Sequence, residues 1–171
     1  MSGDFLIRDA TPDDAPVILS LIRALAEYEK SPSEAVATEA QIRETLFGPR
    51  RSAEVVLACE GKNPVGFAVF FHNYSTWLGR PGLYLEDLFV SPSARGRGYG
   101  RRLLAHLAML ARDRGCPRMD WSVLDWNEPA IGFYRALGAI PMDEWTVYRL
   151  TGPSLESLAD EGALALRQSG G

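Results

Sequence analysis

A strand that runs through a glycine- and arginine-rich loop into a helix is the feature that most constrains this chain of 171 residues. Residues 83–90 read as a strand, residues 95–100 read Arg-Gly-Arg-Gly-Tyr-Gly, and a helix is predicted over about 98–113. Glycines let the backbone turn tightly and leave N–H groups exposed, while the helix start adds further N–H groups and a partial positive charge. The pattern therefore predicts a site for a phosphate group.

Arginine is concentrated around this loop. Seven arginines lie between positions 95 and 118 against one acid, Asp113, in a chain whose net charge is −4. Arg101 and Arg102 fall in the first predicted turn of the helix, where the helix dipole disfavours cations. The glycine spacing fits neither a dinucleotide-binding G-x-G-x-x-G nor a P-loop, which needs Gly-Lys-Ser/Thr. A solvated basic helix start after an ordinary turn remains the alternative.

Composition limits the classes of protein that this chain fits. Its length and hydrophobic content of 46% fit one domain over residues 1–150, followed by a partly disordered tail at 151–171. The pI near 5.2 argues against nucleic-acid binding. Cys59 and Cys116 have no histidine at ligand spacing, so we expect neither a metal site nor a disulfide. With no signal peptide and no apolar run of the roughly 18 residues that a membrane span needs, we expect a cytoplasmic protein without membrane contact.

Periodicity and turn residues predict a mixed α/β fold. Strands are predicted at 5–8, 54–60, 65–74, 83–90, 118–124 and 145–150, and helices at 12–28, 38–47, 98–113, 128–137 and, in the tail, 154–160. Gly115 is the expected C-cap of the helix at 98–113, and Asn127 the expected N-cap of the helix at 128–137. The apolar face of the helix at 98–113 is predicted to contain Leu103, Leu104, Leu107, Leu110 and Ala111. The strand at 118–124 should run parallel to that at 83–90, because a helix connects the two. The result is a βαβα unit joined to an antiparallel meander, with the ligand outside the carboxyl ends of the parallel strands.

Two carboxylates interrupt the otherwise apolar strand at 83–90. Strict alternation places Glu86 on one face with Tyr84 and Leu88, and Asp87 on the other face with Leu85. Burial raises the pKa of a carboxylate, and a pKa near neutrality makes a better general base. We favour Glu86 as the base, because it lies closest to the reactive end of a ligand held by the loop. For Asp87 we favour the alternative that backbone N–H groups or a buried arginine hold the carboxylate.

Tyr134 is the candidate general acid. It lies on the helix after the strand at 118–124, which a right-handed crossover places beside the strand at 83–90. A phenol of pKa about 10 can donate a proton to a departing thiolate, whose parent thiol has a pKa of about 8.5. The alternative is a core tyrosine that packs against Phe133.

Several motifs in register resemble those of the GNAT acetyltransferase superfamily, in particular its spermidine/spermine and thialysine N-acetyltransferase branch. The likeness extends over about residues 5–150. It rests on the segments 84–90, 95–100, 126–129 and 133–139, with support from 7–8 and 25–29. The resemblance implies a GNAT-like, mostly antiparallel sheet flanked by helices, with a βαβα half that binds the cofactor.

The resemblance also implies an activity and a set of site residues. The activity is transfer of an acetyl group from acetyl-CoA to a primary amine of a small molecule, by direct attack in a ternary complex. Glu86 would be the base, through water, and Tyr134 the acid. When the roles of the family's motif residues are carried over to this sequence, the residues that would contact the cofactor are Leu88, Phe89, Val90, Arg95, Gly96, Arg97, Gly98, Tyr99, Gly100, Arg101, Asn127 and Tyr134. The amine would contact Tyr28, Glu29, Trp77 and Glu86.

One departure bears on the substrate. Polyamine-acetylating members resemble Asp-Pro-Trp where this chain has Ser-Thr-Trp at 75–77, and that form, with 124–127, resembles the thialysine subgroup. We therefore expect a lysine-like amino acid or a diamine in preference to a polyamine. The family also implies a homodimer with the final strand and tail at the interface. The alternatives are a protein or peptide N-acetyltransferase, a non-catalytic CoA-binding module and a phosphate-handling transferase.

Overall fold

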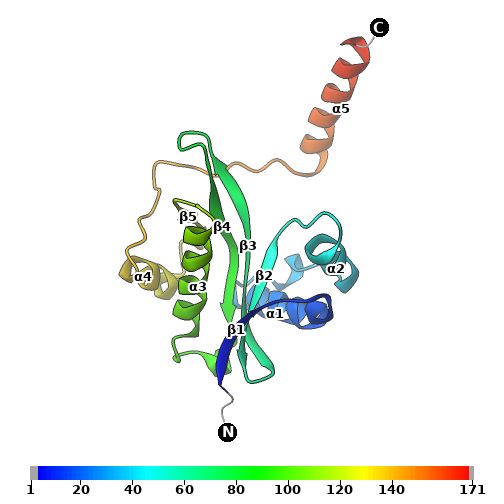
Figure 1. The fold of residues 1–171 in the computed structure, drawn as a ribbon. Helices are drawn as coiled ribbons and strands as arrows, with labels where there is room; N and C mark the ends of the chain where they lie inside the picture. Colours follow the sequence, from blue (N-terminus) through cyan, green and yellow to red (C-terminus); the bar gives the residue numbers. More distant parts are fainter. Residues whose placement is uncertain (1–3, 170–171) are drawn as a thin grey trace. The chain divides into compact units, whose positions relative to one another are not determined.

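The computed structural model describes residues 4–169, which form two compact units that meet in sequence between Trp126 and Asn127 (Figure 1). Among the described residues, no helix has the length and apolar content that crossing a membrane requires. The first unit contains β1 (Phe5–Asp9), α1 (Ala15–Tyr28), α2 (Glu39–Phe47), β2 (Glu54–Glu60), β3 (Asn63–Ser75), β4 (Arg80–Val90), α3 (Tyr99–Asp113) and β5 (Met119–Asp120). The second contains α4 (Glu128–Ala136) and α5 (Gly152–Ser169).

The first unit is built on a five-stranded sheet with the strand order β1-β2-β3-β4-β5. The first four strands pair antiparallel, and β5 pairs parallel to β4 after the crossover through α3. The mixed sheet and the parallel pair confirm the predicted fold class. The strand predicted at 118–124 is shorter than expected, because only Met119 and Asp120 pair, with Leu83 and Tyr84 of β4.

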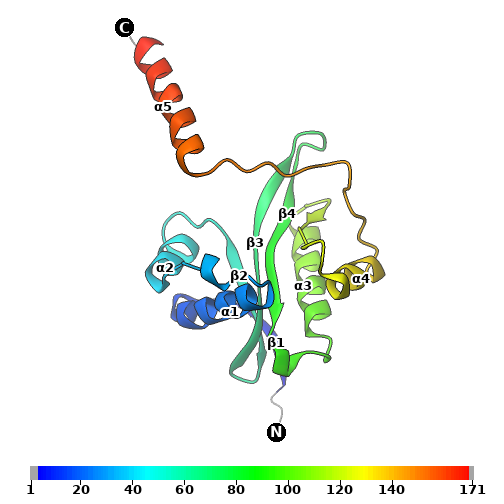
Figure 2. The ribbon, with the colours of Figure 1, turned by 180° about the vertical axis from the view of Figure 1, so that it is seen from behind.

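Helices cover both faces of this sheet. Figures 1 and 2 show α1 and α2 on one face and α3 on the other. The apolar stripe of α1 at helical spacing, Ile18, Leu21 and Leu25, is buried against inward-facing side chains of the sheet that include Leu57 and Phe67. On α3 the buried stripe is Leu103, Leu104, Leu107 and Ala111, and Leu110, which the periodicity places on the same face, is partly buried.

The ends of α3 also follow the sequence prediction. The helix begins at Tyr99 after Gly98, which adopts a left-handed conformation with φ of 76°. It ends before Gly115, whose φ is 71°. The N–H of Gly115 donates to Arg112 O at 3.1 Å and the N–H of Cys116 donates to Ala111 O at 2.8 Å. This pair of bonds is the glycine-terminated C-cap expected from the sequence.

The predicted strand at 145–150 is wrong. Residues 139–151 form no helix or strand, and Trp145, Val147 and Tyr148 expose 69%, 82% and 93% of their surface. A strand needs a neighbour to complete its hydrogen bonds, and the local β-pattern of these residues cannot supply one.

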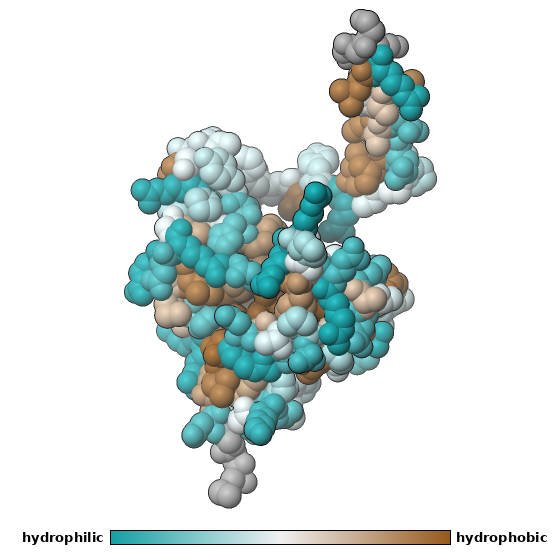
Figure 3. All heavy atoms as spheres, turned by 45° about the vertical axis from the view of Figure 1, so that its right-hand side comes forward, coloured by the Kyte–Doolittle hydropathy of each residue, from teal (hydrophilic) through white to brown (hydrophobic). Residues whose placement is uncertain are grey.

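The helix expected at 154–160 is longer, since α5 spans Gly152–Ser169, and Figure 3 shows apolar side chains gathered along one side of it.

Candidate active site

A β-bulge in β4 sets the directions of the two candidate carboxylates. Asp87 pairs with Val69 and Leu85 pairs with Phe70, so Glu86 is an extra residue without a partner on β3. A bulge of this kind redirects side chains, and bulges are common next to active sites. The strict alternation predicted from the sequence therefore fails at Glu86. Asp87 and Leu85 do not share a face.

The negative charges of two other carboxylates act on Asp87 at the bulge. Burial, followed by the negative charges of Glu86 and Glu29, raises the pKa of Asp87 to about 6. Burial also raises the pKa of Glu29. Within the described chain none of the three pairs with a cation and no hydrogen bond holds the Asp87 carboxylate, so neither of the partners expected for Asp87, backbone N–H groups or a buried arginine, is found. The three carboxylates together attract a cation and repel an anion.

The β5 side of β4 is open beyond the bulge. The parallel pairing with β5 ends at Tyr84, although β4 continues to Val90. In the described residues no strand therefore pairs with this edge over residues 85–90. Arg95 partly covers its end, because Arg95 Nε donates to Val90 O at 3.0 Å. The remaining edge presents backbone donors and acceptors that an extended amide-containing ligand can use.

The loop after β4 presents backbone N–H groups at the start of α3. Gly96 and Gly98 both have φ of 76°, and the N-terminus of the helix has no side-chain cap. In the described part of the chain, no protein acceptor takes the N–H groups of residues 96–101. We call these six groups the N–H cradle. The cradle and the positive end of the helix dipole are a geometry that can hold an anion, and the anion site predicted from the sequence stays a prediction.

Contacts with β1 and β2 hold the two sides of the cradle. Glu60 at the end of β2 forms an ion pair with Arg97 and accepts a hydrogen bond of 2.7 Å from the hydroxyl of Tyr99. Phe5 of β1 stacks on Tyr99 with ring centroids 4.2 Å apart, and Arg102 lies 3.8 Å over the Phe5 ring. These contacts explain the tolerance of Arg102 near the positive end of the helix dipole.

Arg101 is the cation left for a ligand at the cradle. It is exposed, and no residue in the described chain pairs with it. Arg97, which the sequence also predicts as a cofactor contact, already pairs with Glu60. The contact of Glu60 with Arg97 could not be predicted from the sequence around either residue, because the two are 37 residues apart.

Tyr28 lies within a row of cations and aromatic rings near the cradle. The Arg95 guanidinium is 4.7 Å from the centre of the Tyr28 ring and 5.4 Å from that of Phe89. The centres of the Tyr28 and Trp126 rings are 6.3 Å apart. Arg95 therefore joins the predicted amine-binding residue Tyr28 to the start of the predicted cofactor loop.

Asn127 and Tyr134 belong to the second unit. The Asn127 side chain accepts from the N–H of Ala130 at 3.4 Å, which makes it the N-cap of α4 as predicted. Tyr134 is partly buried and lies beside Phe133, with ring centroids 5.6 Å apart. Gly138, with φ of 88°, ends the helix where the sequence predicts. The roles of Asn127 and Tyr134 toward ligands stay predictions.

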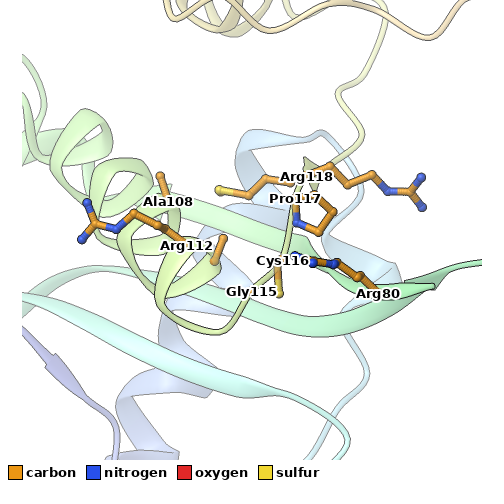
Figure 4. Close-up of a pocket in the computed structure, with 9 residues that line it drawn as sticks. Arg80, Ala108, Arg112, Gly115, Cys116, Pro117 and Arg118 are labelled. Carbon is orange, nitrogen blue, oxygen red and sulfur yellow. The ribbon is translucent and has the colours of Figure 1, made fainter. Parts of the chain in front are cut away.

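Two further features lie outside the carboxylate cluster and the cradle. Trp77, which is 89% exposed, lies at the tip of the hairpin between β3 and β4. A cavity of about 480 Å³ lies at the C-terminal end of α3, and none of the predicted site residues lines it. Figure 4 shows its Arg112 and Arg118 side chains directed away from each other. The cavity is thus at the opposite end of α3 from the cradle.

Comparison with known proteins identifies the family. Residues 19–139 match the model of the acetyltransferase (GNAT) family. The chain belongs to this family. Thialysine N-epsilon-acetyltransferases of Caenorhabditis elegans and Bos taurus are 37% and 39% identical to it, over 92% and 90% of this chain and 99% and 96% of theirs. A solved integron cassette protein from the mobile metagenome of V. cholerae is 30% identical, with a TM-score of 0.78, over 93% of this chain and 98% of that one.

Membership of the family gives the chain its enzyme class. It is an acetyltransferase, and GNAT acetyltransferases use acetyl-CoA as cosubstrate. The carboxylate cluster and the N–H cradle are therefore candidate parts of the active site of a GNAT enzyme.

Proposed function

We propose that this chain moves an acetyl group from acetyl-CoA to a primary amine of a small molecule, by direct attack in a ternary complex. The substrate class is a lysine-like amino acid such as thialysine, a diamine or a polyamine. The names of the relatives from Caenorhabditis elegans and Bos taurus support this class. The observation that carries the proposal is the N–H cradle at the start of a 15-residue helix, because it fits the diphosphate of a coenzyme.

The residues around the cradle fit acetyl-CoA, which supplies the acetyl group as a reactive thioester. The N–H groups of residues 96–101 would hold the diphosphate, and Arg101 would add a positive charge. The open edge of β4 from Leu88 to Val90 would pair with the amides of the pantetheine arm. Arg97 and Tyr99 would contribute by fixing the conformation of the loop, because both side chains already contact Glu60.

The carboxylates supply the base. An alkylammonium has a pKa of about 10.4, so it must lose a proton before its nitrogen can attack. Glu86 is exposed and sits at the bulge, so it can take this proton through water, while the half-buried Asp87 adds negative charge that attracts the amine. Tyr134 of the second unit would give a proton to the departing sulfur. Asn127 would help hold the cofactor.

The amine site would be formed by Tyr28, Glu29 and Trp77. The Tyr28 ring offers an aromatic face, and the partly buried Glu29 interacts electrostatically with Asp87. A cationic amine therefore meets an aromatic face and negative charge together. Trp77 lies at the hairpin tip and would contact the substrate from there.

A second copy of the chain is the partner that we propose for the exposed segment at 140–150. Ile140, Trp145, Val147 and Tyr148 expose between 69% and 93% of their surface, which is unusual for large apolar residues that lie close together in sequence. The alternating pattern at 145–150 is ready to pair as a strand. A homodimer would supply the missing neighbour. The cytoplasmic location stays a prediction, and Cys59 and Cys116 are both buried free thiols.

Turnover of two glycine variants tests the proposed function. The wild-type protein should acetylate thialysine and lysine with release of CoA. Gly98→Ala and Gly115→Ala both place a side chain at positive φ, at opposite ends of α3, with no atom within 4 Å of the new Cβ. Each should lose about 1 kcal/mol of stability. Only Gly98→Ala should raise the KM for acetyl-CoA, by about tenfold, since it reorients donors to a charged group.

Two results would contradict the proposal. The first is a wild-type protein that binds acetyl-CoA without acetylating any small amine, which would favour a binding module or a protein acetyltransferase. The second is an equal change of the KM for acetyl-CoA in both variants, because strain at either end of α3 would then explain the effect.

A further inference from the structure

Lys30 occupies a backbone position that normally favours glycine. Helix α1 ends at Tyr28, and Lys30 follows with φ of 63°, the one positive φ of a non-glycine residue among residues 4–169. The N–H of Lys30 donates to Glu27 O at 3.1 Å, and that of Ser31 donates to Ala26 O at 2.9 Å. This is a glycine-type C-cap in which a side chain carries a cost. The turn itself therefore does not explain the lysine.

The side chain of Lys30 lies on the aromatic surface beside the proposed amine site. Its Nζ is 4.2 Å from the centre of the Trp126 ring, and the Tyr28 ring is 6.3 Å from Trp126. Trp126 and Tyr28 are 45% and 37% exposed, so this aromatic pair is open to a ligand. The contact places a fixed ammonium group at one edge of the aromatic pair.

Lys30 keeps its charge available, because no carboxylate of the described chain forms an ion pair with it. This is notable because Glu29 is its neighbour in sequence and also lacks a cation. Glu29, Glu86 and Asp87 thus lack an ion-pair partner, and so does the Lys30 ammonium beside the aromatic pair. A ligand that carries both a cation and an anion can use both kinds of charge.

We propose that Lys30 receives the α-carboxylate of an amino-acid substrate and so makes the enzyme prefer amino acids to diamines and polyamines. This inference rests on the proposed acetyl transfer to a small amine. The side-chain ammonium of the substrate goes toward the carboxylates, its methylene chain lies against Tyr28 and Trp126, and its carboxylate accepts hydrogen bonds from Lys30 Nζ. A diamine brings a cation or a methylene group to Lys30 and gains no such contact.

Lysine and cadaverine form a matched substrate pair, because they differ only in the α-carboxylate. The ratio of their kcat/KM values should be measured for the wild-type protein, Lys30→Gln and Lys30→Arg. We expect the wild type to favour lysine by about tenfold or more, as one charge-assisted contact gives. Lys30→Gln should bring the ratio close to one by raising the KM for lysine alone. Lys30→Arg should keep the preference.

Controls separate this role from a structural one. The KM for acetyl-CoA and the melting temperature of Lys30→Gln should equal those of the wild type. Lys30→Gly relieves the positive φ, so it should fold at least as well as the wild type and lose the preference for lysine. Two results would overturn the inference alone: an active wild type without preference for lysine, or Lys30 variants that lose lysine and cadaverine turnover equally. A wild type that acetylates neither amine would refute the proposed function itself.

Discussion

Replacing Asp87 by asparagine should stabilise the protein at neutral pH. Burial and the charges of Glu86 and Glu29 raise the pKa of Asp87 from an ordinary 3.8 to about 6. The folded state therefore binds this proton more tightly than the unfolded state does. The stability that the protonated form provides is complete below pH 4 and is lost as the pH rises through 6. Asparagine stays neutral at every pH and avoids this loss.

The size of the effect follows from the rise in pKa. At 1.36 kcal/mol per pKa unit, a rise from 3.8 to about 6 corresponds to about 3 kcal/mol at pH 7.5. For a chain of this size that is a rise in Tm of about 6–12 °C. Urea and thermal unfolding of the wild type and Asp87→Asn at pH 4, 5, 6 and 7.5 would measure it. The gain should grow with pH and vanish near pH 4.

Asp14→Asn is a control in which the change in stability should have the opposite sign. Hydrogen bonds from Arg8, each 2.8 Å long, lower the pKa of Asp14 to about 2. Its ionised form therefore adds stability above pH 4 that is lost as the pH falls through 2. Asp14→Asn should cost about 1–2 kcal/mol at pH 7.5, since the partly exposed Arg8 weakens the pair. If Asp87→Asn proved less stable than the wild type at pH 7.5, the account of the carboxylate cluster would be refuted.

Two further predictions concern the base and the partner. Glu86→Gln should lower kcat by about 10²–10⁴-fold without changing the KM for acetyl-CoA, whereas Asp87→Asn should lose less than tenfold; steady-state kinetics would assign the base to Asp87 if the order were reversed. Trp145→Glu should convert a wild-type dimer into a monomer in sedimentation experiments, because it places a charge in the proposed interface. A wild-type protein that sediments as a monomer would exclude the homodimer.

Local patterns predicted the elements that depend on neighbours in the sequence. The helical stripe and glycine cap of α3, the Asn127 cap and the loop at 95–100 are all set within a few residues, and all are found. The predicted strand at 145–150 fails because a strand depends on a distant partner. The β5 strand is short for the same reason.

The site residues show the same division between local and distant effects. The bulge at Glu86 arises from the register between β3 and β4, which alternation along a single strand does not reveal. Burial, followed by the charges of Glu86 and of Glu29, raises the pKa of Asp87, and Glu29 lies far from Asp87 in sequence. Likewise, Glu60 and Lys30 act through Arg97 and Trp126, which are far away in sequence. Such long-range pairs give no signal in a single sequence.

The proposed function requires that the N–H cradle of residues 96–101 binds the diphosphate of acetyl-CoA. Amide resonances of the isotopically labelled protein, followed during titration with CoA, test this directly because each N–H group is observed by itself. The amides of Gly96, Gly98 and Gly100 should shift most and saturate together. Saturation by CoA with these amides unmoved, and with shifts grouped instead around the cavity at Cys116, would contradict it.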